Sequence, residues 1–198
     1  MLRIGLVMLQ GARHAHIASI EAASSNSQIP VEVHEIRKLS DLQSSDPHAI
    51  ILPGGESTTM RLTGLDKASN LLPSLFQWIR DNPDRPVLGT CAGAILLSEP
   101  QDGGLPLVDA CIDRNAYGRQ SDSFQDTIYS PLLERDFPGV FIRAPRFTSN
   151  DAEISAMHGE EVVGVRSGNV IALTFHPELS GDPGFHDWLL GSAKEAME

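Results

Sequence analysis

Two short motifs in this 198-residue chain hold side chains that could act as a nucleophile and its base. The first is Gly89-Thr90-Cys91-Ala92-Gly93, which lies between an apolar run and the start of a helical pattern. A Gly-x-nucleophile-x-Gly sequence at a strand-to-helix junction is typical of a nucleophile elbow, a tight turn that exposes its central side chain. The helix start would favour the thiolate of Cys91, and the N–H of Ala92 would face a developing oxyanion. The alternative is that Cys91 is a small buried core residue.

The second motif, His176-Pro177-Glu178, directly follows the apolar run 170–175. Residues two apart in an extended chain point the same way, so Glu178 could fix the tautomer and orientation of His176. With Cys91 this pair would complete a Cys–His–Glu triad in which His176 is the base. Taken alone, the motif is explained better by a loop histidine beside a solvated glutamate. Two strand-end motifs that complete each other favour the triad.

A third strand end carries the sequence LPGGEST, residues 52–58. Gly54 and Gly55 would let backbone N–H groups approach a ligand closely. A phosphate-binding loop is the rival interpretation, and it fails because no Gly-Lys-Ser/Thr follows. We therefore expect a second oxyanion donor from Gly54 or Gly55. Ser57 or Thr58 is expected to cap the helix that follows.

Several other polar residues are weaker candidates. His14 and His16 could ligate a metal, but no third ligand with suitable spacing accompanies them, so a place on a helix surface is expected and no metal site is predicted. Cys111 falls in the apolar run 107–112 and is expected in the core. Arginine forks suit carboxylate recognition, with surface salt bridges as the alternative, in a stretch that holds Arg114, Arg119, Arg143 and Arg146.

Strand-like and helix-like patterns must position these motifs, and they alternate along the first half of the chain. Continuous apolar strands separated by helices predict an α/β fold of three layers, with a mostly parallel mixed sheet and helices on both faces. Later strands with few helices between them are expected to add antiparallel strands to this sheet. The expected strands are residues 2–9, 31–36, 49–52, 86–89, 107–112, 124–129, 139–142, 161–165 and 170–175, and the expected helices are residues 13–24, 71–81, 92–97 and 183–197.

Length and composition limit the classes of protein to which this chain could belong. A chain of this length without repeats or long linkers is expected to form one domain over residues 1–198. The net charge of −11 argues against nucleic acid as a partner, and no basic run or 20-residue apolar stretch suggests a membrane. The apolar N-terminus is expected to be a core strand. Two cysteines imply no disulfide framework, which favours the cytoplasm.

Taken together, the cysteine elbow and Phe175-His176-Pro177-Glu178 resemble the motifs of class I, triad-type glutamine amidotransferases, whose sheet is flavodoxin-like. Further stretches resemble the glutaminase subunits of pyridoxal 5′-phosphate synthase, and the resemblance runs from about residue 4 to residue 188. These stretches are Leu9-Gln10-Gly11-Ala12, Pro53-Gly54-Gly55-Glu56-Ser57-Thr58-Thr59-Met60, Arg114-Asn115-Ala116-Tyr117-Gly118-Arg119-Gln120 and Phe141-Ile142-Arg143-Ala144-Pro145.

This resemblance implies hydrolysis of L-glutamine to glutamate and ammonia, which passes to a separate (β/α)₈-barrel synthase subunit for vitamin B6 synthesis. Twelve glutaminase subunits would decorate a dodecameric synthase, and this chain itself would bind no cofactor. Cys91, His176 and Glu178 would be catalytic, and Gly54 and Ala92 would form the oxyanion hole. The glutamine site would be lined by Gly54, Gly55, Glu56, Arg114, Ile142 and Arg143.

Two rival functions remain open at this point. One is another cysteine hydrolase on a related sheet, such as a peptidase, which the His-Pro-Glu and PGGEST sequences disfavour. The other is a non-catalytic subunit that only regulates a synthase, which the complete Cys91–His176–Glu178 set disfavours. Ala15 stands where the family often carries an acidic residue, which concerns contact with the partner more than the chemistry.

Overall fold

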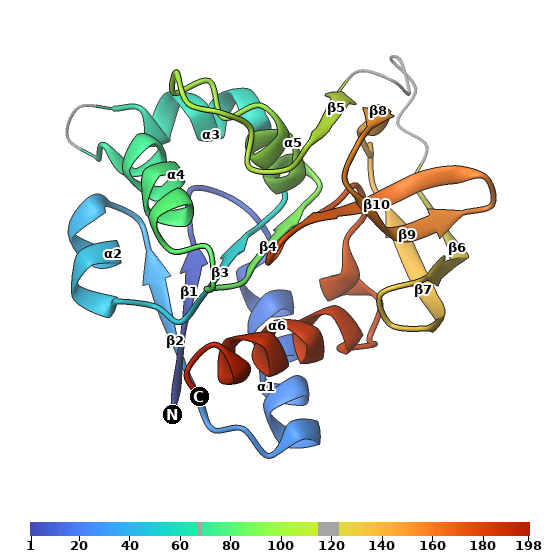
Figure 1. Cartoon of the computed structure of the whole chain (residues 1–198), viewed down its shortest axis with the longest axis horizontal. Coiled ribbons are helices and arrows are strands. Elements are labelled where there is room, and N and C mark those ends of the chain that lie inside the picture. The colour runs from blue at the N-terminus through green and yellow to red at the C-terminus, as the bar shows by residue number, and fades with distance from the viewer. Residues whose placement is uncertain (67–68, 115–122) are drawn as a thin grey trace.

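The computed structural model describes residues 1–66, 69–114 and 123–198, and strands and helices alternate through its first half (Figure 1). The strands are β1 (Leu2–Val7), β2 (Val31–Ile36), β3 (Ala49–Leu52), β4 (Val87–Thr90), β5 (Ala110–Asp113), β6 (Phe124–Ser130), β7 (Arg135–Phe141), β8 (Arg146–Asn150), β9 (Glu153–His158), β10 (Glu161–Ser167) and β11 (Val170–Leu173). The helices are α1 (Arg13–Ser27), α2 (Leu39–Ser45), α3 (Ser57–Gly64), α4 (Leu71–Asp81), α5 (Ala92–Ser98), the 3₁₀ turn η1 (Pro177–Leu179) and α6 (Gly184–Glu195).

A central sheet has the strand order β2-β1-β3-β4-β11-β10-β9-β6-β7. The first five strands in this order are parallel, with Leu6 of β1 opposite Ile51 and Leu88 of β4 opposite Ile171. Every residue of β3 and β4 is buried, because helices cover both faces of the parallel part. The apolar N-terminus is therefore a core strand, as predicted. The carboxyl ends of β1, β3, β4 and β11 meet at one edge.

The remaining strands extend the sheet in antiparallel fashion, as expected from the second half of the sequence. The predicted strand 107–112 is partly wrong. Leu107 and Val108 are buried beside α5, where the Leu107 N–H donates to Leu97 O at 2.9 Å, and β5 begins only at Ala110. β5 pairs with β8 in a separate two-stranded sheet.

Two apolar clusters hold the helices on the two faces of the sheet. On one face, α2, α4 and α5 pack with residues such as Leu75, Phe76 and Leu96. On the other face, α1 and α6 lie side by side and contribute residues such as Ile20 and Phe185 (Figure 1). The predicted three-layer α/β fold with a mixed sheet is confirmed. Within the described ranges, no helix is long and apolar enough to cross a membrane.

Candidate active site

Cys91 lies at the turn between β4 and α5, where the sequence predicted an elbow. Its backbone has φ 50° and ψ −107°, a combination that residues other than glycine rarely adopt. Such strained conformations persist only where the surrounding structure enforces them. The Cys91 N–H donates to Leu173 O of the neighbouring strand at 2.8 Å, and its carbonyl accepts from Ile95 N–H at 3.3 Å. The turn is therefore held by both the sheet and the helix.

The two glycines of the elbow are required by close packing. A Cβ on Gly93 would lie 1.9 Å from the carbonyl oxygen of Leu52 in β3. A Cβ on Gly89 would lie 2.4 Å from a methyl carbon of Leu97 and 3.0 Å from the backbone of Gly93. The first of these contacts is to rigid backbone, so α5 can lie this close to β3 only without a side chain at Gly93.

His176 and Glu178 lie at the same sheet edge, just beyond β11. The His176 N–H donates to Val140 O at 2.8 Å, which fixes the loop against β7. The His176 Nδ1 lies 2.8 Å from Glu178 Oε1, and the carboxylate side chain is only 1% exposed. Nδ1 is thus turned toward Glu178 and carries the proton of this contact. This leaves Nε2 as the ring nitrogen available to a nucleophile or substrate.

The surroundings of His176 favour its protonated form. Burial opposes the charge, but the hydrogen bonds to Cys91 and Glu178 outweigh it and raise the pKa of His176 to about 10. Burial likewise disfavours the Glu178 carboxylate, but the hydrogen bond from His176 and the nearby His16 lower its pKa below the ordinary value. Both causes point to an imidazolium held between a thiol group and a carboxylate.

Gly54 and Gly55 form a loop against these side chains. A Cβ on Gly54 would lie 2.7 Å from His176 Cε1 and 3.2 Å from Cys91 Cβ, so the backbone of this loop faces the two directly. Gly55 has φ 147°, and the next N–H, that of Glu56, donates to Gln10 Oε1 at 2.6 Å. No role was predicted for Gln10. Its position three residues beyond the end of β1, at the shared carboxyl edge, would have been the clue.

Glu56, not Ser57 or Thr58, caps α3. Its carboxylate accepts hydrogen bonds from Thr58 N–H at 3.0 Å and from Thr59 N–H and Thr59 Oγ1 at 2.7 Å each. Those from Thr59 and Thr58 lower the pKa of Glu56 to about 2. The expectation for Ser57 and Thr58 is wrong because Glu56 precedes the first helical residue and its longer side chain reaches both N–H groups.

The other predicted site residues lie around this edge to different degrees. The carbonyl oxygen of Ile142 is 4.0 Å from Cys91 Sγ, at the end of β7. Arg143 follows it with φ 44° and an exposed side chain, and Ala92 is the buried first residue of α5. Arg114 is exposed just after β5, and Arg119 lies outside the described residues.

Two further expectations are wrong. Cys111 is exposed, because β5 belongs to a small two-stranded sheet and its alternation turns Ile112 inward instead. His16 is fully buried, because the first turn of α1 packs against η1 and α6. His16 Nδ1 lies 3.1 Å from Nε2 of His186, which is also fully buried, and His16 Nε2 lies 3.6 Å from Glu178 Oε1.

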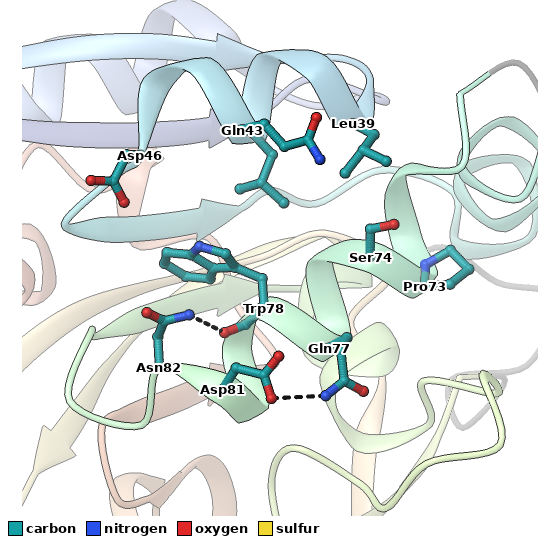
Figure 2. Close-up of a pocket in the computed structure, with 10 residues that line it drawn as sticks. Leu39, Gln43, Asp46, Pro73, Ser74, Gln77, Trp78, Asp81 and Asn82 are labelled. Carbon is teal, nitrogen blue, oxygen red and sulfur yellow. Dashed lines mark hydrogen bonds between the residues drawn. The ribbon is translucent and has the colours of Figure 1, made fainter.

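A separate groove of about 500 Å³ lies between α2 and α4, around Trp78 (Figure 2). Its polar groups are largely occupied: Gln77 donates to Asp81, and Asn82 donates to the Trp78 carbonyl. Asp46 at one end pairs with Arg85. The groove contains none of the predicted site residues, so the sheet edge remains the candidate active site.

Comparison with known proteins agrees with this geometry. Residues 6–195 match the SNO glutamine amidotransferase family. The chain is 41% identical to pyridoxal 5′-phosphate synthase subunit PdxT of Thermococcus onnurineus (strain NA1), covering 98% of this chain and 100% of the relative. It is 38% identical to the subunit of the same name from Bacillus mycoides (strain KBAB4), covering 99% and 97%.

Comparison with solved structures agrees with these sequence matches. A crystal structure of a glutamine amidotransferase, 34% identical, aligns with a TM-score of 0.78 over 96% of this chain and 98% of its own. The structure of PurLQS from Thermotoga maritima, at 18% identity and a TM-score of 0.65, shares the fold. The family match covers nearly the whole chain and includes both strand-end motifs. The chain therefore belongs to the SNO glutamine amidotransferase family.

Proposed function

We propose that this chain hydrolyses L-glutamine to L-glutamate and ammonia, and that it supplies the ammonia for pyridoxal 5′-phosphate (vitamin B6) synthesis. The observation that carries the proposal is the convergence of three groups at one sheet edge. Cys91 stands on a strained elbow, His176 is hydrogen bonded to Glu178, and the Gly54 backbone faces both side chains. Such an arrangement suits attack on an amide carbonyl.

In the proposed reaction, the Cys91 thiolate attacks the side-chain amide carbon of glutamine, and the carbonyl π electrons move to the oxygen. The N–H groups of Gly54 and Ala92 stabilise this oxyanion. Protonated His176 gives its proton to the amide nitrogen, so ammonia leaves and a γ-glutamyl thioester remains. His176 then takes a proton from water, which attacks the thioester and releases glutamate. Glu178 keeps the imidazole oriented throughout.

The remaining predicted residues hold the amino-acid end of glutamine. Glu56 offers a carboxylate to the α-ammonium group, and Arg114 and Arg143 offer guanidinium groups to the α-carboxylate. Gly55 and Ile142 contribute backbone groups beside the nucleophile. Arg143 and Glu56 are both exposed, as a site open to a soluble substrate requires.

The ammonia is consumed by a second subunit in this proposal. Relatives that are similar over nearly their whole length carry the name of a pyridoxal 5′-phosphate synthase subunit. Ammonia released into water at neutral pH becomes ammonium, which is not nucleophilic, so direct transfer to a docked synthase preserves its reactivity. We infer a (β/α)₈-barrel partner, a complex of twelve plus twelve subunits, and a cytoplasmic location.

The decisive test is glutamate release from L-glutamine, measured with and without the synthase partner. Cys91→Ala is expected to reduce the rate by at least about 10³-fold, since it removes the nucleophile. Cys111→Ala is the matched control, because that thiol is exposed in the small sheet and should leave the rate unchanged. We expect the partner to raise the wild-type rate sharply by turning the Gly54–Gly55 peptide so that its N–H faces the oxyanion.

The same assay distinguishes the rival functions. Unchanged glutamine-dependent synthesis by Cys91→Ala would identify a regulatory subunit. Hydrolysis of peptides or esters in preference to glutamine would identify another cysteine hydrolase.

A further inference from the structure

Behind the proposed triad, two histidines from distant parts of the chain meet in the core. His16 belongs to the first turn of α1 and His186 to the first turn of α6, 170 residues later. Both side chains are fully buried, which is unusual for so polar a group without a ligand or a partner. Their ring nitrogens lie 3.1 Å apart, and their ring centroids lie 5.4 Å apart.

The pair is connected to the triad through Glu178. His16 Nε2 lies 3.6 Å from Glu178 Oε1, the same oxygen that accepts from His176 Nδ1 at 2.8 Å. Neither His16 Nε2 nor Glu178 Oε2 has a hydrogen-bond partner within the described residues, so 3.6 Å separates His16 Nε2 from the carboxylate without a full hydrogen bond. The carboxylate is 1% exposed, so water does not solvate its charge.

The carboxylate decides which nitrogen carries each proton. A lone pair on His16 Nε2 would face the negatively charged oxygen, so this nitrogen carries the hydrogen and points it at Glu178. His16 Nδ1 is then an acceptor, and His186 Nε2 must be the donor to it. Burial lowers the pKa of His16, with His176 adding to this and Glu178 opposing it, and burial lowers the pKa of His186 to about 3. Both rings are therefore neutral, and all the donors point toward Glu178.

We propose that His16 and His186 are positioning residues of the triad, forming a buried donor chain that ends on the Glu178 carboxylate. His16 aims a second N–H at that carboxylate in a dry site, and His186 locks the tautomer that turns this N–H toward the charge. The chain His186–His16–Glu178–His176–Cys91 then fixes the base that serves the nucleophile. This inference deepens the proposed function and rests on it for its kinetic readout alone.

Two readouts test the proposal, in the full chain with its synthase partner and a Cys111→Ala background. One is the kcat and KM of glutamine hydrolysis. The other is the pH dependence of Cys91 alkylation by iodoacetamide, which requires no glutamine chemistry. The groups whose charges act on the His176 imidazole are Cys91 and Glu178. Neutral His16 acts on it only through Glu178, so a change at His16 is read through Glu178 in the acid limb of alkylation.

His16→Leu is expected to lower kcat about tenfold with little change in KM, because Glu178 loses a donor to its charge. The acid limb of alkylation should move up by about one pH unit, because Glu178 without its second N–H neighbour no longer holds His176 in the position that stabilises the thiolate. His16→Gln should restore both values, since its amide nitrogen falls near Nε2. His16→Asn should not, since its amide nitrogen falls near Nδ1. Comparing the His16→Gln and His16→Asn variants still tests the role of Nε2 even if His16→Leu fails to fold.

His186→Leu should give a smaller loss of kcat, and the double variant should be no worse than His16→Leu, because His186 acts only through His16. Additive losses with an unmoved alkylation profile would show a merely structural role and overturn the proposal. Equal defects in His16→Gln and His16→Asn would overturn it as well. A wild type that releases no glutamate, while His16→Leu still shifts alkylation, would refute the proposed function and support the donor chain.

Discussion

At the scale of single residues, the chemistry depends on how the His176 proton is held. A pKa raised to about 10 keeps the His176 imidazole protonated across the physiological range. The hydrogen bonds to Cys91 and Glu178 achieve this against the opposing effect of burial. His176 is thus protonated before substrate arrives, and in the proposed first step it gives this proton to the leaving ammonia.

Glu178→Gln tests this protonation state. Removing the negative charge lowers the pKa of His176 from about 10 toward its ordinary value, so the imidazolium is lost at lower pH. We expect the alkaline limb of kcat/KM to move to lower pH and the rate above about pH 8 to fall at least tenfold. The measurement is glutamate release between pH 6 and 10.5 with the synthase partner present.

Asp182→Asn is the control for Glu178→Gln, because that carboxylate pairs with Arg135 away from the proposed triad. Its alkaline limb should coincide with that of the wild type. An alkaline limb that stays in place in Glu178→Gln would mean that Glu178 does not hold the His176 proton.

At the scale of elements, the N-terminus of α3 gives Glu56 two possible tasks. Glu56→Ala should destabilise the protein by about 0.5–2 kcal/mol, because the Thr58 and Thr59 N–H groups lose their acceptor. Glu56→Ser should keep most of the stability, since serine is a good N-cap. If Glu56 also binds the substrate ammonium, both variants should raise the KM for glutamine about tenfold. Urea unfolding and steady-state kinetics separate the two tasks, and an unchanged KM in Glu56→Ser would leave only the cap.

The cysteine elbow requires a glycine at position 93 of α5. Gly93→Ala places a methyl group 1.9 Å from the Leu52 carbonyl, so β3 and α5 must separate. We expect a loss of about 3 kcal/mol in the free energy of unfolding and a large loss of activity, because the Cys91 backbone shifts with the helix. Chemical denaturation and glutamate release measure the two effects.

Gly191→Ala in α6 is the matched control for the elbow. A Cβ there meets no atom within 4 Å, and alanine suits a helix interior better than glycine. The free energy of unfolding should rise by about 0.5–1 kcal/mol with activity retained. Equal behaviour of the two alanine variants would refute the packing argument at Gly93.

At the scale of the whole molecule, the two apolar layers share one sheet, which supports the proposal that residues 1–198 form a single domain. The two tryptophans report on different faces: Trp78 packs on the α4 side and Trp188 on the α6 side. Trp78→Phe and Trp188→Phe therefore leave one fluorescent reporter each.

In each single-tryptophan variant, the fluorescence midpoint in urea should coincide with the midpoint from far-UV circular dichroism. The physical reason is that neither face can lose its helices without exposing the sheet that the other face needs. Two separated transitions would show that the faces unfold independently and would count against a single domain.

Many of the strands and helices, and both proposed catalytic motifs, could be predicted from the sequence alone. Strands 31–36 and 49–52 and the helix 71–81 match the structure residue for residue, because alternating residues, a short apolar run and strong helical periodicity each favour one burial pattern. The cysteine elbow and the His-Pro-Glu motif could also be predicted, because each is a local sequence pattern at the end of a strand. Short polar elements such as α2, β8 and β9 were missed, because their sequences carry little periodicity and their partners form them.

Only the tertiary structure decided what the motifs contact. It brought Gln10 against the Gly55–Glu56 turn and turned Cys111 outward, and it buried His16 beside His186 behind Glu178. These contacts join residues from 46 to 170 positions apart. No local pattern encodes them, because they depend on how α1, α6 and the sheet edge pack together. The residues of the proposed reaction can be identified from the sequence. The environment that sets their protonation forms only when the chain folds.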